Sequence, residues 1–245
     1  MARANLPAMT PPPSWKVLQH DAIEEFTDNL WRVEGELPTV ALRRHMLVVK
    51  NDDGRLLIHN GIALDEEGMA RLEEWGTPTW LVVPSAFHRM DARRYKDRYP
   101  DLVVICPRGA RKKVEKVVPV DLTYDEIEGT DTFSLTHLRG LGEVEGVLEV
   151  RSKDGVTLIF NDALFNQPHL PGLFGAVYKM LGQTGRPKVT GVTRLFLVKD
   201  KSEYAAHLHE LSELADLVRI MPGHIAPIVD DARGVLAGVA DELAE

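Results

Sequence analysis

Short apolar blocks, separated by charged or turn-forming residues, dominate the pattern of this chain. Blocks of this kind are typical of β-strands. We predict strands at 29–36, 45–50, 55–59, 79–83, 102–105, 132–136, 146–150, 156–160 and 217–221. The Asp-Gly pairs at 53–54 and 154–155 predict tight hairpin turns between two pairs of these strands.

Longer, charge-rich segments between and after these strands predict helices. We predict them at 65–74, 91–99, 109–116, 202–217 and 231–243. Asp65 is a suitable N-cap for the first helix, with Leu72 on its apolar side, and Pro100 ends the second. The fourth helix carries leucines at a spacing of three, at Leu208, Leu211, Leu214 and Leu217.

The order of these elements predicts an α/β fold with some parallel strand pairing, because strands and helices alternate in the first half. A strand-rich middle and helices near the end fit one layered domain over residues 21–245. Residues 1–20 contain the proline run 11–13, and we expect them to form an extended lead-in.

The composition supports a soluble protein with a sizeable core. Apolar residues make up 44% of the chain, while the net charge of −8 and the dispersed basic residues argue against a nucleic-acid surface. One basic stretch at 108–116 is expected to be the solvated face of a helix; a patch for an anionic ligand is the alternative.

The single cysteine, Cys106, excludes an internal disulfide and a cysteine-based zinc site, and we expect it to be an inert buried residue. No apolar run approaches the ~20 residues that span a bilayer. The first residues lack the apolar core of a signal peptide. We therefore expect a cytoplasmic protein with no membrane partner.

Three histidine and aspartate positions share one feature: each lies just after a predicted strand. His88 follows strand 79–83, Asp162 follows strand 156–160, and His224 follows strand 217–221. Strands that end at the same edge of a sheet would bring these side chains together. Two imidazoles and a carboxylate at one point would form a metal site.

The order of these pieces resembles the metallo-β-lactamase superfamily over residues 29–228. Asn161-Asp162-Ala163-Leu164-Phe165 is similar to the family segment Gly-Asp-x-Leu-Phe, and Gly223-His224 is similar to its last histidine motif. The resemblance implies a four-layer αββα sandwich of two mixed sheets. It also places the metal site at the edge where the two sheets face each other.

The chain departs from this family in its first metal motif, His-x-His-x-Asp-His. The final histidine falls on His88, but Val83, Ser85 and Phe87 occupy the other three ligand positions. The resemblance therefore implies that the ligands of the first of two metal ions are missing.

The family turn Gly-His-x-x-Gly is also altered, because Gly142 and Gly146 are kept while Glu143 stands at the histidine position. Glu143 is thus a substitute ligand by alignment, and an exposed residue paired with a basic side chain by the simpler interpretation. The ligands carried over from the resemblance are His88, Asp162 and His224.

Three such ligands with open positions suit catalytic zinc, and non-haem iron uses the same set. We expect a mononuclear hydrolase of a small ester, lactone or amide in which a metal-bound water attacks; an iron oxygenase is the less favoured enzyme. Asp91, three residues after His88, is a candidate base or extra ligand. The alternative is a non-catalytic binding or interaction protein that keeps the metallo-β-lactamase-like sandwich and has lost its dinuclear site.

Two further features leave alternatives open. The apolar segment 163–182 is core or a packed helix, a lid over the pocket, or the contact of a homodimer. His45 and His59 fall within predicted strands and are expected to be half-buried core residues. The sequence has no Gly-x-Ser-x-Gly elbow, phosphate-binding loop of the Walker type or His-Glu-x-x-His helix, so the enzyme classes that these motifs mark are not indicated.

Overall fold

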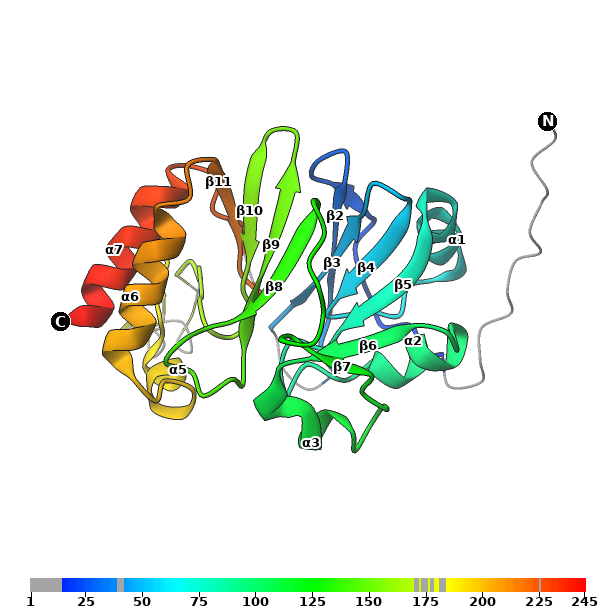
Figure 1. Cartoon of the computed structure of the whole chain (residues 1–245), viewed down its shortest axis with the longest axis horizontal. Helices are drawn as coiled ribbons and strands as arrows, with labels where there is room; N and C mark the ends of the chain where they lie inside the picture. The colour runs from blue at the N-terminus through cyan, green and yellow to red at the C-terminus, as the bar shows by residue number, and fades with distance from the viewer. Residues whose placement is uncertain are drawn as a thin grey trace.

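The computed structural model describes residues 15–38, 42–169, 172, 176, 179–180, 184–224 and 226–245. Two β-sheets face each other, and helices cover the outer side of each sheet (Figure 1). This arrangement is the predicted αββα sandwich. Within the described residues, no helix is long and apolar enough to cross a membrane.

The first sheet has seven strands, paired in chain order. The pairings from β1 to β4 are antiparallel, and those from β4 to β7 are parallel, so the sheet is mixed. Its strands are β1 (Glu24–Glu25), β2 (Leu30–Gly35), β3 (Arg44–Lys50), β4 (Arg55–His59), β5 (Thr77–Val82), β6 (Val103–Cys106) and β7 (Leu122–Thr123).

The second sheet has four strands in the order β11-β10-β9-β8. β10 and β11 are parallel neighbours, whereas the other two pairings are antiparallel. Its strands are β8 (Phe133–His137), β9 (Gly146–Ser152), β10 (Gly155–Ile159) and β11 (Leu217–Met221). The parallel pair brings the carboxyl ends of β10 and β11 to one edge.

The helices divide between the two outer layers (Figure 1). On the first sheet lie α1 (Glu66–Trp75), α2 (Ala92–Arg98) and α3 (Arg111–Val114), the last preceded by a 3-10 turn at Arg108–Ala110. Beyond the second sheet lie α6 (Lys201–Ser212) and α7 (Ala232–Ala244), with the short α5 (Gly191–Phe196) below them in the view.

Strand alternation divides the apolar residues among three cores. In β4, Leu57 points into the core between the sheets, while Leu56 and Ile58 point to the face that helices cover. A third core lies between the second sheet and its helices, where Leu208 of α6 and Leu236 of α7 are buried. Burial on both faces explains why so many strands are continuous apolar runs.

The N-cap of α1 is as predicted, because the Asp65 carboxylate accepts a hydrogen bond from the Gly68 N–H at 2.8 Å. The fourth predicted helix, in contrast, is wrong in its length: α6 ends at Ser212. Leu214 lies beyond it, and Leu217 pairs with Val156 as the first residue of β11. The leucines at every third position therefore continue past the end of the helix into a strand, and their spacing does not mark where the helix ends.

The predicted lead-in is described from residue 15 onward, and there Trp15 donates a hydrogen bond to the Leu64 carbonyl at 2.8 Å and packs on the core of the first sheet. Cys106 is buried, and burial raises the pKa of its thiol to about 12. Much of segment 163–182 lies outside the described residues, so its role stays a prediction.

Candidate metal centre

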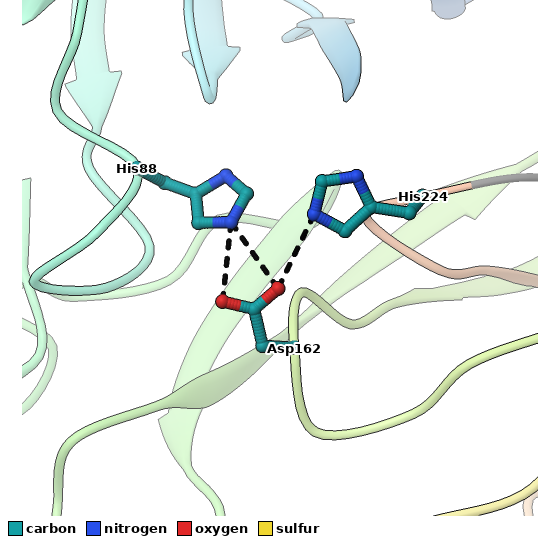
Figure 2. A group of neighbouring side chains, drawn as sticks. All are labelled: His88, Asp162 and His224. Atoms are coloured by element: carbon teal, nitrogen blue, oxygen red, sulfur yellow. Dashed lines mark hydrogen bonds and ion pairs between the residues drawn. The ribbon is translucent and has the colours of Figure 1, made fainter. Parts of the chain in front are cut away.

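The side chains of His88, Asp162 and His224 point toward one another (Figure 2). Each lies on a loop that follows the carboxyl end of a strand: β5 for His88, β10 for Asp162 and β11 for His224. One potential ligand atom from each residue lies within 4.8 Å of the others. Within the part of the chain that the structure describes, no further His, Cys, Asp or Glu joins this group.

The carboxylate lies between the two imidazoles (Figure 2). The Nε2 atom of His88 is 3.1 and 3.2 Å from the two oxygens of Asp162, and the Nε2 atom of His224 is 3.3 Å from Oδ1. The two imidazole rings are tilted, with centroids 5.1 Å apart. All three groups are partly or fully buried.

The other nitrogen of each imidazole has an acceptor that fixes the tautomer. Nδ1 of His224 is 2.7 Å from the backbone carbonyl oxygen of Arg43, which only accepts hydrogen bonds. Nδ1 of His88 is 3.3 Å from the side-chain oxygen of Asn60. The amide orientation of Asn60 is itself set, because its Nδ2 donates to the His45 carbonyl at 2.8 Å.

With both Nδ1 atoms protonated, each Nε2 presents either a lone pair or a second proton to Asp162. Two lone pairs and a carboxylate facing one another repel, so this arrangement requires a cation: protons on the imidazoles or a metal ion among the three groups. The donor set and the buried hydrogen-bonded backing are those of a histidine-carboxylate metal site. The residues present therefore fit a metal ion.

The charge state of Asp162 also suits a metal ligand. Burial by itself would raise the pKa of this carboxyl, but the charges and hydrogen bonds of His88 and His224 outweigh burial and hold the pKa well below its usual range. Asp162 is thus ionised at neutral pH and supplies the negative charge of the cluster.

Glu145, which sequence reasoning missed, lies directly behind this aspartate. It is fully buried, and its Oε1 accepts from the backbone N–H of Asp162 at 3.1 Å and from the Asn161 side chain at 3.4 Å. Burial, followed by the nearby charge of Asp162, raises the pKa of Glu145 well above its usual range. The sequence signal was faint: Glu145 lies two residues after Glu143 in the glycine-flanked turn.

Glu143 itself is placed away from the cluster. It is half-exposed, adopts a positive φ of 59°, and pairs with Arg108 at 3.2 Å. This is the simpler of its two interpretations. Arg108 also pairs with Asp125, so the basic stretch is partly neutralised by acidic neighbours.

Asp91 is not brought to the cluster either. Its carboxylate is buried and is bound by the guanidinium groups of Arg44 and Arg94, with a long hydrogen bond of 3.4 Å from the Ala63 N–H. Both oxygens therefore have cationic partners, and the local spacing from His88 did not indicate this.

The three positions where the family motif would have further ligands are occupied by Val83, Ser85 and Phe87, which do not join the cluster. Val83 is buried in the core, and the Ser85 hydroxyl accepts from the Phe87 N–H at 3.2 Å. The Phe87 side chain is 74% exposed. The geometry thus offers ligands for one ion.

Two buried histidines lie near the cluster without joining it. Burial lowers the pKa of His59 to about 3, helped by the charge of His88. Burial and the charge of Arg32 lower the pKa of His45 to about 4, and its Nδ1 is 3.1 Å from the Pro222 carbonyl. Both are more buried than predicted, and both are neutral at physiological pH.

No protein-family model matches the sequence, and a comparison with curated protein sequences finds no match. Solved structures, in contrast, share its fold. The metallo-β-lactamase FIM-1 from Pseudomonas aeruginosa, in its mono-zinc form, has a TM-score of 0.57 at 10% identity, over 90% of this chain and 95% of that chain.

Two further structures agree. The metallo-β-lactamase DIM-1 exposed to ceftazidime has a TM-score of 0.56 at 14% identity, over 93% of this chain and 99% of that chain. A metallo-β-lactamase from Erythrobacter litoralis with β-mercaptoethanol in the active site has a TM-score of 0.61 at 12% identity, over 90% and 96%. The chain therefore has the metallo-β-lactamase fold, as its sequence motifs predicted.

Proposed function

We propose that this protein is a metal-dependent hydrolase with one metal ion, held by His88, Asp162 and His224, that cleaves a small ester, lactone or amide. One observation carries the proposal. Three acceptor groups from three separate loops converge. Hydrogen bonds hold a proton on Nδ1 of both imidazoles, so the two Nε2 lone pairs and the Asp162 carboxylate would repel one another without a cation among them. The mono-zinc form of one structural neighbour supports a single zinc ion.

When bound, a zinc or ferrous ion would lower the pKa of a water ligand toward ~7 and polarise a carbonyl. The protein's part is to prepare the ligands. Arg43 and Asn60 fix the imidazole tautomers, and Glu145 orients Asp162 through its backbone N–H. Three protein ligands leave open positions for water and substrate. Asp91 is committed to its two arginines, so we assign it to the scaffold of this site.

The proposal is tested by metal content, measured by plasma mass spectrometry on untagged protein after chelation and refilling with zinc or ferrous iron. We expect about one ion per chain, lost in His224→Ala and in the isosteric Asp162→Asn. His209→Ala is the matched control, because His209 lies on α6 and pairs with Asp241. Circular dichroism would verify that each variant is folded.

A second candidate function, a non-catalytic binding or interaction protein, is favoured by one observation. Val83, Ser85 and Phe87 stand where the resemblance places ligands for another ion. If the chelated and refilled protein holds no metal under any condition, the hydrolase proposal is wrong and this alternative replaces it. Metal-dependent turnover of p-nitrophenyl acetate that His224→Ala abolishes would exclude the alternative.

A further inference from the structure

A cavity of about 170 Å³ opens beside the two imidazoles of the candidate metal centre. His88 and His224 form part of its wall, so a molecule in the cavity would contact the cluster. The rest of the wall is largely apolar, from Leu37, Leu42, Phe87 and Met90. These four side chains come from two separate stretches of the first half of the chain.

The polar groups of the wall are already engaged. Arg44 is buried, its Nη1 donates to the Gly61 carbonyl at 3.2 Å, and its Nη2 binds Asp91. Its positive charge is therefore neutralised within the protein. The side chain of Asn60 is occupied by His88 and by the His45 carbonyl. Outside the metal cluster, the described residues of the wall thus present no unpaired charge to an anionic group.

The size of the cavity limits the group it can hold. A protein cavity of roughly 150 Å³ lined by apolar side chains accommodates benzene. A volume of 170 Å³ therefore suits a group of about six carbons. Each buried methylene in such a wall is expected to strengthen binding about fourfold.

We propose that this cavity binds an uncharged acyl or alkyl group of about six carbons. The substrate class is then a neutral ester, lactone or amide with a medium-length apolar substituent, and not an anionic compound. The reaction rests on the proposed function, whereas the binding of the apolar group does not.

Binding is tested first, on chelated protein, so that the outcome is independent of turnover. Methionine methyl groups are labelled with ¹³C, the Met90 signal is assigned with Met90→Leu, and 1-hexanol or hexanoate is titrated. We expect hexanol to shift the Met90 signal at concentrations at least tenfold lower than hexanoate. Equal effects of the two ligands, or no shift with either, would overturn the proposal.

Filling the cavity should weaken this binding. Leu42→Trp and, independently, Leu37→Phe are expected to weaken hexanol binding at least tenfold. Leu195→Trp is the matched control, since Leu195 lies on α5 and is 74% exposed; its hexanol binding should be unchanged. Unaltered binding in both folded cavity variants would place hexanol elsewhere and contradict the proposal.

Turnover then separates this inference from the proposed function. With zinc-loaded protein, kcat/KM for p-nitrophenyl esters should rise about fourfold per methylene from acetate to hexanoate and fall by decanoate. Hexanol binding at Met90 without turnover of any ester would reject the hydrolase and keep the cavity. Turnover that is indifferent to chain length, with no shift at Met90, would keep the hydrolase and reject the cavity.

Discussion

Replacing His59 by glutamine should make the protein less sensitive to mild acid. His59 lies at the end of β4, on the same side as Leu57, and only 3% of the residue is exposed. Burial keeps its imidazole neutral in the folded protein, with a pKa of about 3 against an ordinary value of 6.5. In the unfolded chain the same imidazole takes up a proton below pH 6.5.

The magnitude follows from this difference. Between pH 6.5 and 3 the unfolded state binds one more proton than the folded state at this residue, so stability is lost as the pH falls through this window. A pH of 5 lies about 1.5 pH units below the pKa of the unfolded chain, so protonation of the unfolded state lowers the free energy of unfolding there by about 2 kcal/mol. The glutamine variant lacks this loss. Its free energy of unfolding, relative to the unaltered protein, should rise by about 2 kcal/mol from pH 7.5 to pH 5.

The assay is urea denaturation of both proteins at pH 7.5, 6 and 5, with the free energy of unfolding taken by linear extrapolation. A constant loss from imperfect packing of glutamine cancels, because only the change of the difference with pH is used. His209→Gln is the control for removing one imidazole from an exposed position. A difference that stays the same within about 0.3 kcal/mol at pH 7.5 and 5 would refute the reasoning.

Two further predictions concern stability. Asp91→Asn removes the carboxylate charge that binds the buried guanidinium of Arg44, so it should lower the free energy of unfolding by about 3–5 kcal/mol. Zinc content should stay unchanged because Asp91 is outside the cluster, and loss of zinc from the folded variant would contradict this. Gly140 has a φ of 77°, and a Cβ there would clash with the carbonyl of Asp200. Gly140→Ala should cost at least about 3 kcal/mol in urea denaturation, whereas Gly54→Ala, with a φ of 82° and open space, should cost about 1–2 kcal/mol; equal losses would show that the clash is relieved.

The longer strands of the two sheets were predictable because their signal is local, whereas the two-residue strands β1 and β7 were not predicted. Strand β4 reads as an apolar run between a turn and a histidine, and both of its faces are buried. Strand β1, in contrast, is two exposed glutamates, and it exists because its backbone pairs with Arg32 and Trp31. No pattern of side chains marks such a strand. Helix α5 was missed for a related reason: its apolar residues Val192 and Leu195 face outward, so no buried stripe reveals it.

The three candidate ligands were predictable because each follows its own strand. Their supporting contacts come from elsewhere in the chain. The Arg43 carbonyl, which holds His224, is a backbone group far away in sequence, and its role depends on how β3 meets the loop after β11. The candidate role of Asp91 rested on its closeness to His88 in sequence, whereas its carboxylate is bound by Arg44 of β3. Local sequence patterns therefore predicted the candidate ligands, whereas the hydrogen-bond and ion-pair partners of these side chains depend on tertiary packing.

The two sheets each contribute to the cluster, since His88 follows a strand of the first sheet while Asp162 and His224 follow strands of the second. An ion bound there would join the sheets across the apolar seam that they share. It would bind the folded chain and not the unfolded one, and at a concentration one hundred times its Kd it would add about 2.7 kcal/mol to stability. Under metal starvation, the seam would open more often and expose the chain to proteases. The supply of metal would then set the lifetime of this protein in the cell as well as its activity.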